Sequence, residues 1–198
     1  MEYSEVPINF DKVTKHLDFS ESEKTPERAA EVAKLNKLYK DLVGVNSDVP
    51  PPPNQINGRL TDQVKKLKES GNQAFKRSSY ADAIRMYGLA IEMALKRASW
   101  EASGYQREEL SVLFSNRSQA YMSTGSWGEG MVDADTAIFL RRSFPKAHYR
   151  KGKCLQNLGR LREAKDAYEL GLESGGTDGS VAELKNALAD VEELLFKK

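Results

Sequence analysis

Five side chains suited to binding an anion occur at helical spacing along this chain. They are Lys68, Asn72, Asn116, Lys146 and Arg150. Each lysine lies four residues before another member of the set, so each of these pairs occupies one face of a helix. Cations and amide groups donate hydrogen bonds, and these bonds are strongest when the acceptor is charged. Each residue alone is typical of a solvated helix surface, whereas together they indicate a site for a negatively charged ligand.

The sequence contains no set of residues spaced for catalysis or metal binding. His16 and His148 stand apart, with no cysteine, histidine or carboxylate at ligand spacing. A GxSxG motif, a phosphate-binding glycine loop and a Ser/His/Asp order are all absent from the sequence. The single cysteine, Cys154, falls at a core-facing position, where a buried apolar role is favoured over a reactive thiol. We therefore expect a protein that is not an enzyme and binds neither a cofactor nor a metal ion.

From Thr61 onward the sequence has a helical pattern that repeats. Each repeat begins at a small residue, Gly71, Ser118 or Gly152, and the starts are 47 and 34 residues apart. Small residues at fixed places allow two antiparallel helices to pack at short distance. A glycine inside a helix costs about 1 kcal/mol relative to alanine. We therefore predict that Gly71 marks a point where a neighbouring helix leaves no room for a side chain.

This pattern resembles the tetratricopeptide repeat (TPR) family over residues 61–174. The resemblance implies an all-α solenoid of three antiparallel helix pairs, and a last helix after the GGTDG segment is expected to cap it. The thirteen extra residues between the first two repeats are expected to lengthen the two helices that flank them. We predict an N-terminal partner-docking region at 1–48, a proline-rich linker at 49–60, and the TPR domain with its capping helix at 61–198.

The N-terminal region is predicted to form two short strands and one helix. Apolar residues alternate in the INF and LDF segments, and Thr25 can cap a helix that starts at Pro26 and ends at Gly44. The apolar side chains of this region exceed what so short a segment buries by itself, so we expect it to dock onto a partner. The prolines at 50–53 favour an extended polyproline II spacer.

When the positions of the five donors are counted from the small residue of each repeat, they resemble those of the two-carboxylate clamp of chaperone-binding TPR domains. That clamp grips a C-terminal Glu-Glu-Val-Asp tail. The resemblance implies that Lys68, Asn72 and Asn116 hold the terminal main-chain carboxylate. It also implies that Lys146 and Arg150, both expected to point into a solvated groove, meet the last side-chain carboxylate or nearby carbonyl groups.

Two further residues are assigned to the peptide site by the same resemblance. Phe75, one turn after Asn72, resembles the apolar wall that takes the valine of the tail. Gln119 stands where a smaller residue is usual, which affects the selectivity of that pocket. The predicted site therefore combines an apolar wall with the donors of the clamp.

Composition excludes several classes of partner. A net charge of +1 gives no general attraction to nucleic acid or to anionic membranes. No run approaches the roughly 18 apolar residues of a membrane-spanning helix, and the first ten residues lack the pattern of a signal peptide. Any location at a membrane is therefore expected to come from a partner.

The segment LAIEMALKRASWEA, with its long connection between repeats, resembles the TPR subunit of the fungal SEC complex for post-translational translocation into the endoplasmic reticulum (ER). The resemblance implies a peripheral subunit on the cytosolic face of the ER membrane. Its N-terminal region would dock onto a single-span membrane subunit of the complex. Its groove would receive the tails of cytosolic seventy-kilodalton heat-shock chaperones. Two alternatives stay open: a structural scaffold whose groove is filled by its partner, and a free cytosolic co-chaperone adaptor.

Overall fold

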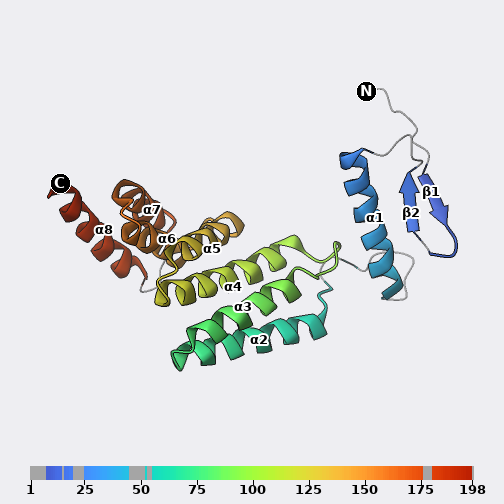
Figure 1. Cartoon of the computed structure of the whole chain (residues 1–198), viewed down its shortest axis with the longest axis horizontal. Coiled ribbons are helices and arrows are strands. Elements are labelled where there is room, and N and C mark those ends of the chain that lie inside the picture. The colour runs from blue at the N-terminus through green and yellow to red at the C-terminus, as the bar shows by residue number, and fades with distance from the viewer. Residues whose placement is uncertain are drawn as a thin grey trace. The chain divides into compact units, whose positions relative to one another are not determined.

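The computed structural model describes residues 8–14, 16–19, 25–44, 52, 55–175 and 180–197. Within these residues the chain forms eight helices and one two-stranded antiparallel sheet (Figure 1). It divides into two compact units, residues 1–55 with Ala98–Trp100 and residues 56–97 with 101–198. The predicted polyproline II segment lies outside the described residues except for Pro52.

The first unit contains a β-hairpin and one helix. Strands β1 (Ile8–Asp11) and β2 (His16–Phe19) pair antiparallel, with Phe10 opposite Leu17. Helix α1 (Pro26–Gly44) begins where the backbone N–H of Arg28 donates to Oγ1 of Thr25 at 3.3 Å. These elements confirm the two short strands and the helix that the sequence predicts.

Asn36 connects α1 to the hairpin. Its Oδ1 accepts a hydrogen bond from the N–H of Leu17 at 2.8 Å, and its Nδ2 donates to the carbonyl of Leu17 at 2.9 Å. Phe19 and Val32 are buried. Several other apolar side chains of this unit remain exposed: Ile8, Phe10, Val13, Leu35, Tyr39 and Val43. The described part of the unit therefore leaves much of its apolar surface in contact with solvent.

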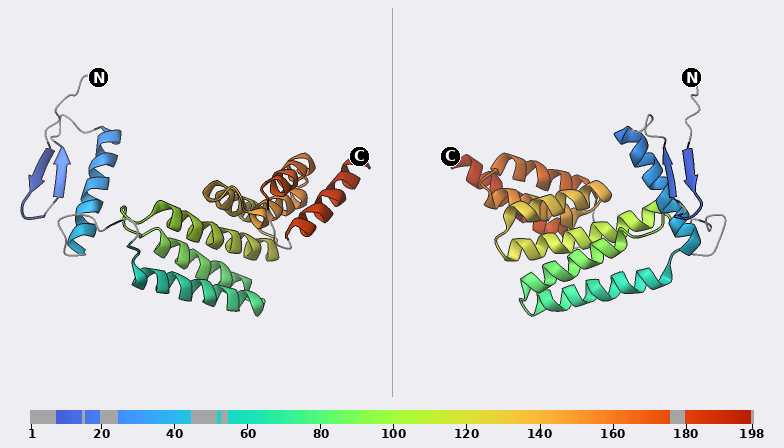
Figure 2. Two further views of the ribbon diagram at one scale, coloured as in Figure 1. Left: turned by 180° about the vertical axis from the view of Figure 1, so that it is seen from behind. Right: turned by 45° about the vertical axis from the view of Figure 1, so that its right-hand side comes forward.

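The second unit consists of three antiparallel helix pairs and a final helix. The pairs are α2 (Gly58–Lys76) with α3 (Tyr80–Ala94), α4 (Ser103–Ser123) with α5 (Trp127–Leu140), and α6 (Pro145–Asn157) with α7 (Leu161–Glu173). Consecutive helices lie side by side (Figure 2). Helix α8 (Ser180–Phe196) packs on α6 and α7, and its Leu184 and Val191 share a core with Tyr168. This architecture is the predicted three-repeat solenoid with its capping helix.

In the first and third repeats, the glycine that opens the repeat faces an aromatic ring of the next helix. A Cβ atom on Gly71 would lie 2.6 Å from Cε1 of Tyr87, and one on Gly152 would lie 2.2 Å from Cε1 of Tyr168. Both distances are too short for a side chain unless the ring moves. The prediction that Gly71 marks a close approach between helices is therefore confirmed.

Replacing Gly71 by alanine is expected to lower the melting temperature, whereas Gly88→Ala in α3 is expected to raise it. Overpacking against the Tyr87 ring costs about 1–3 kcal/mol. The nearest atom to a Cβ on Gly88 is Nη1 of Arg117, at an ordinary contact distance of 3.7 Å. An alanine there gains about 1 kcal/mol of helix propensity without a clash. Calorimetric melting of both variants tests this, and shifts in the same direction would contradict it.

The extra residues between the first two repeats lengthen one flanking helix and form a connection. Helix α4 has 21 residues, but α3 has 15, close to the 14 of α5. In the connection, Arg97 is 2% exposed. Its guanidinium lies 2.7 Å from the carboxylate of Glu101 and 2.9 Å from that of Glu109, and it donates to the hydroxyl of Thr61 at 3.1 Å. The prediction is therefore right for α4 and wrong for α3, because this ion cluster holds the added residues in a connection between the two helices.

Candidate peptide-binding site

The first helices of the three repeats carry all seven predicted peptide-binding residues. Five of the seven line one hollow of about 230 Å³: Asn72, Phe75, Asn116, Gln119 and Arg150. Lys76 and Tyr87 complete its lining, so no carboxylate among the described residues borders it. The hollow therefore offers amide and cationic donors beside an aromatic wall, which suits an anionic ligand with an apolar part.

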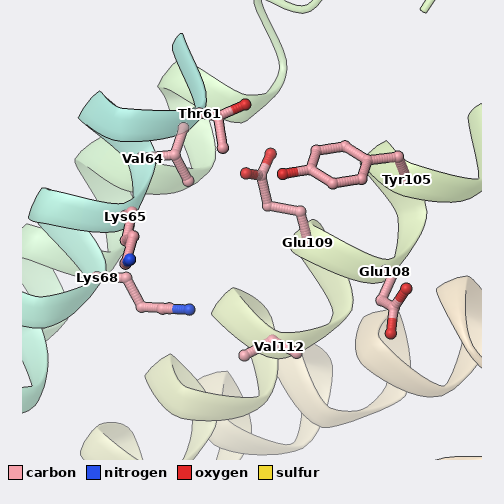
Figure 3. Close-up of a pocket in the computed structure, with 8 residues that line it drawn as sticks. All are labelled: Thr61, Val64, Lys65, Lys68, Tyr105, Glu108, Glu109 and Val112. Carbon is pink, nitrogen blue, oxygen red and sulfur yellow. The ribbon is translucent and has the colours of Figure 1, made fainter. Parts of the chain in front are cut away.

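Lys68 lies in a second hollow of about 260 Å³ between α2 and α4 (Figure 3). The close-up shows its amino group extending from α2 across the hollow, with Glu108 and Glu109 coming from α4. Lys68 precedes Asn72 by one helical turn, so the two hollows follow one another along α2. The structure thus places Lys68 next to the other donors but not in the same hollow.

Lys146 lies on the exposed surface of α6, one turn before Arg150. It lines neither of these two hollows. The two cations that the sequence pairs on one helix face therefore differ in environment: Arg150 borders the hollow, and Lys146 is open to solvent.

Asn72 is oriented by two hydrogen bonds to its side-chain oxygen. The hydroxyl of Tyr87 donates to Oδ1 of Asn72 at 2.7 Å, and Nδ2 of Asn116 donates to the same oxygen at 3.5 Å. With the oxygen engaged, Nδ2 of Asn72 is left to donate, and it donates to no other residue in the described part of the chain. A carboxylate, which only accepts, is a suitable partner for that group.

Arg150 is enclosed by neighbouring side chains. Its Nε donates to Oε1 of Gln119 at 3.2 Å, and its Nη1 donates to the hydroxyl of Ser115, which is fully buried. Burial lowers the pKa of Arg150 to about 10, and the nearby Tyr87 and Glu183 oppose that shift. The guanidinium is therefore charged at neutral pH, but it is more enclosed than the solvated position that the sequence predicts. Its Nη2 donates to no described residue, and Arg150 lines the hollow.

Binding of a peptide through its carboxylates is expected to be independent of pH between about pH 6 and 8.5. Peptide carboxyl groups lose their protons near pH 4, and Arg150, whose pKa is about 10, stays charged below that value. No charge on either side of the contact then changes within the window. Calorimetric titrations at both ends of the range test this, and a marked loss of affinity at either end would show that another group controls binding.

The sequence prediction missed three residues of the site: Lys76 and Tyr87, which line the hollow, and Ser115, which contacts Arg150. Tyr87 follows Gly71 by the same 16 positions that separate Tyr168 from Gly152, so this spacing could have located its ring. The spacing gives no information on the partner of the hydroxyl. Ser115 directly precedes Asn116, and neither its type nor its spacing distinguishes it from other helical serines.

Comparison with known proteins finds relatives among translocation subunits. The chain is 41% identical over 143 residues to the ER protein translocation subcomplex subunit sec67 of Schizosaccharomyces pombe, covering 70% of this chain and 74% of sec67. It is 32% identical over 143 residues to the Translocation protein SEC72 of Saccharomyces cerevisiae, covering 71% of this chain and 72% of SEC72. No family model matches the chain.

Solved structures give two further likenesses. A chain of the Sec complex from S. cerevisiae, solved by cryo-EM, matches with a TM-score of 0.74 at 26% identity, over 96% of this chain and 98% of that one. The second TPR domain of the human RPAP3 protein, solved in complex with the HSP70 peptide SGPTIEEVD, matches with a TM-score of 0.55 at 26% identity. That match covers 67% of this chain and 98% of the domain.

Proposed function

Because the chain belongs to the family of fungal SEC-complex TPR subunits that includes sec67 and SEC72, we propose that it is a non-enzymatic adaptor of post-translational translocation into the ER. Its TPR groove binds the C-terminal Glu-Glu-Val-Asp tails of cytosolic seventy-kilodalton heat-shock chaperones. The chaperones thereby bring unfolded precursors to the translocation machinery.

The observation that carries this proposal is the hollow bordered by Asn72, Asn116 and Arg150, which no carboxylate of the described residues lines. The end of such a tail places its main-chain carboxylate next to an aspartate side chain. Amide donors and an enclosed guanidinium offset the repulsion between these two charges. The human RPAP3 domain, which has the same fold, is bound to a peptide that ends in EEVD, and this supports the choice of ligand.

The proposed roles follow the two-carboxylate clamp. Lys68, Asn72 and Asn116 hold the terminal main-chain carboxylate. Lys146 and Arg150 meet the side-chain carboxylate of the last aspartate or nearby carbonyl groups. The selectivity for the preceding valine comes from the aromatic and amide side chains that line the hollow, namely Phe75 and Gln119.

Amidating the C-terminus of a Glu-Glu-Val-Asp peptide is expected to weaken binding by at least about 2 kcal/mol, because it removes the charged acceptor of the clamp donors. Isothermal titration of the free-acid and amide forms of one peptide measures the difference. Equal affinities would contradict a clamp for the terminal carboxylate. If the free-acid peptide does not bind at all, the structural scaffold becomes the better interpretation.

We assign the docking of the protein at the ER membrane to the first unit. No helix in the described ranges is long and apolar enough to cross a membrane. The exposed apolar side chains of the hairpin and α1, among them Ile8 and Leu35, suit a surface covered by another protein. The proposed partner is a single-span membrane subunit of the SEC complex, which would hold the TPR groove on the cytosolic face.

A further inference from the structure

We propose that Tyr87 is a positioning residue for peptide binding, whose hydroxyl holds the amide of Asn72 with Nδ2 directed at the ligand carboxylate. The inference rests on the proposed function, since it concerns how the same hollow recognises its ligand. Tyr87 lies on α3, the second helix of the first repeat, whereas all the predicted peptide-binding residues lie on first helices.

The ring of Tyr87 is fixed by packing that does not depend on its hydroxyl. Tyr87 is 2% exposed, and the glycine surface of Gly71 lies directly against its ring. The hydroxyl then reaches the hollow and donates to Oδ1 of Asn72 at 2.7 Å. Burial raises the pKa of Tyr87, so the hydroxyl keeps its proton and remains a donor over the physiological pH range.

The direction of the Asn72 amide determines whether it attracts or repels a carboxylate. As arranged, Oδ1 accepts from Tyr87 and Asn116, which turns Nδ2 toward the ligand. Rotating the amide by half a turn would place Oδ1 against the carboxylate, so that two acceptors would face each other. Without the Tyr87 hydroxyl, the longer bond from Asn116, at 3.5 Å, is the one left among the described residues to oppose that rotation.

The third repeat contains a matched control. Tyr168 occupies the place equivalent to Tyr87, is fully buried, and packs on Gly152 as Tyr87 packs on Gly71. Its hydroxyl donates to Oε1 of Gln156 at 3.2 Å, and neither residue borders the hollow. The two tyrosines therefore share a packing role and differ in whether the hydroxyl contacts a peptide-binding residue.

The test compares Tyr87→Phe with Tyr168→Phe in the full chain, using isothermal titration with a free-acid Glu-Glu-Val-Asp peptide. Each variant loses one hydroxyl and keeps its ring, so thermal melting should show similar small losses of stability. We expect Tyr87→Phe to raise the Kd about five- to tenfold, the effect of one well-placed hydrogen bond. Tyr168→Phe should leave the Kd within about twofold of the unmodified protein.

A double-mutant cycle separates positioning from a general structural effect. If Tyr87 acts through Asn72, then Tyr87→Phe should add nothing to the loss caused by Asn72→Ala. Equal Kd values for the two Tyr→Phe variants would overturn the inference, and so would an undiminished effect of Tyr87→Phe in the Asn72→Ala background. Failure of the unmodified protein to bind the peptide would instead refute the proposed function, and the inference with it.

Discussion

Replacing Arg150 by alanine is expected to abolish measurable binding of a Glu-Glu-Val-Asp peptide. The substitution removes a charged donor that is enclosed by the wall of the hollow, where charge-assisted hydrogen bonds are strongest. Truncating one member of such a contact costs roughly 2–5 kcal/mol. Isothermal titration of the variant with the free-acid peptide measures the loss.

Lys146→Ala measures what the exposed cation of the clamp contributes. Lys146 is also a cation on α6, but it is exposed, and an exposed ion pair contributes about 0–1 kcal/mol. The variant should therefore bind only a few-fold more weakly. Native-like affinity of a folded Arg150→Ala protein would rule out the proposed role of Arg150.

Arg150→Ala also leaves the buried hydroxyl of Ser115 without the guanidinium that donates to it. We therefore expect a lower melting temperature in addition to lost binding. Arg150→Lys keeps a positive charge but loses the fork of donors that reaches Gln119 and Ser115. We expect Arg150→Lys to fold and to bind with intermediate affinity. That outcome would indicate that the loss of binding in Arg150→Ala is not a consequence of unfolding.

Deleting residues 1–48 is expected to abolish association with the membrane subunit of the SEC complex and with ER membranes. The removed segment carries the exposed apolar side chains of the first unit, whereas the hollow is built entirely from the second unit. Affinity for the tail peptide should therefore remain nearly unchanged. Co-purification, membrane flotation and peptide titration of the truncated protein measure the three quantities.

A pair of point variants tests the same division of roles without truncation. Leu35→Gln alters an apolar side chain of α1 that is 43% exposed. Lys37→Gln alters an exposed charged side chain on the same helix. Only Leu35→Gln should weaken association with the membrane subunit. If the truncated protein still co-purified with that subunit, docking would have to run through the TPR unit.

Much of the fold could be predicted because residues that recur at a fixed spacing occupy equivalent packing positions in their repeats. Gly71 and Gly152 recur at one place in their repeats, and both lie against a ring. The strands and α1 were also predictable, since alternation, Thr25 and Gly44 are local signals. The same spacing places five predicted residues around one hollow, because positions counted from the small residue share a face of the first helices.

The remaining features depend on contacts between residues far apart in the chain. Arg97 is buried in part because it donates to Thr61, 36 positions away, and nothing local indicates that contact, so the sequence predicts growth of both helices that flank the added residues. The enclosure of Arg150 by Ser115 likewise joins residues 35 positions apart. Patterns within one helix report which face a residue occupies, but not how deeply its neighbours cover it.

The rings of Tyr87 and Tyr168 have a consequence for how duplicated repeats diverge. In the first and third repeats the glycine surface fixes the ring, while the hydroxyl reaches a different partner, Asn72 in the first and Gln156 in the third. A single nucleotide change that exchanges phenylalanine and tyrosine codons can therefore add or remove a polar contact at this place with little effect on packing. One ancestral repeat, once copied, can in this way give rise to copies that share their fold and differ in ligand binding. Selection on binding then acts on the hydroxyl, and selection on folding acts on the ring.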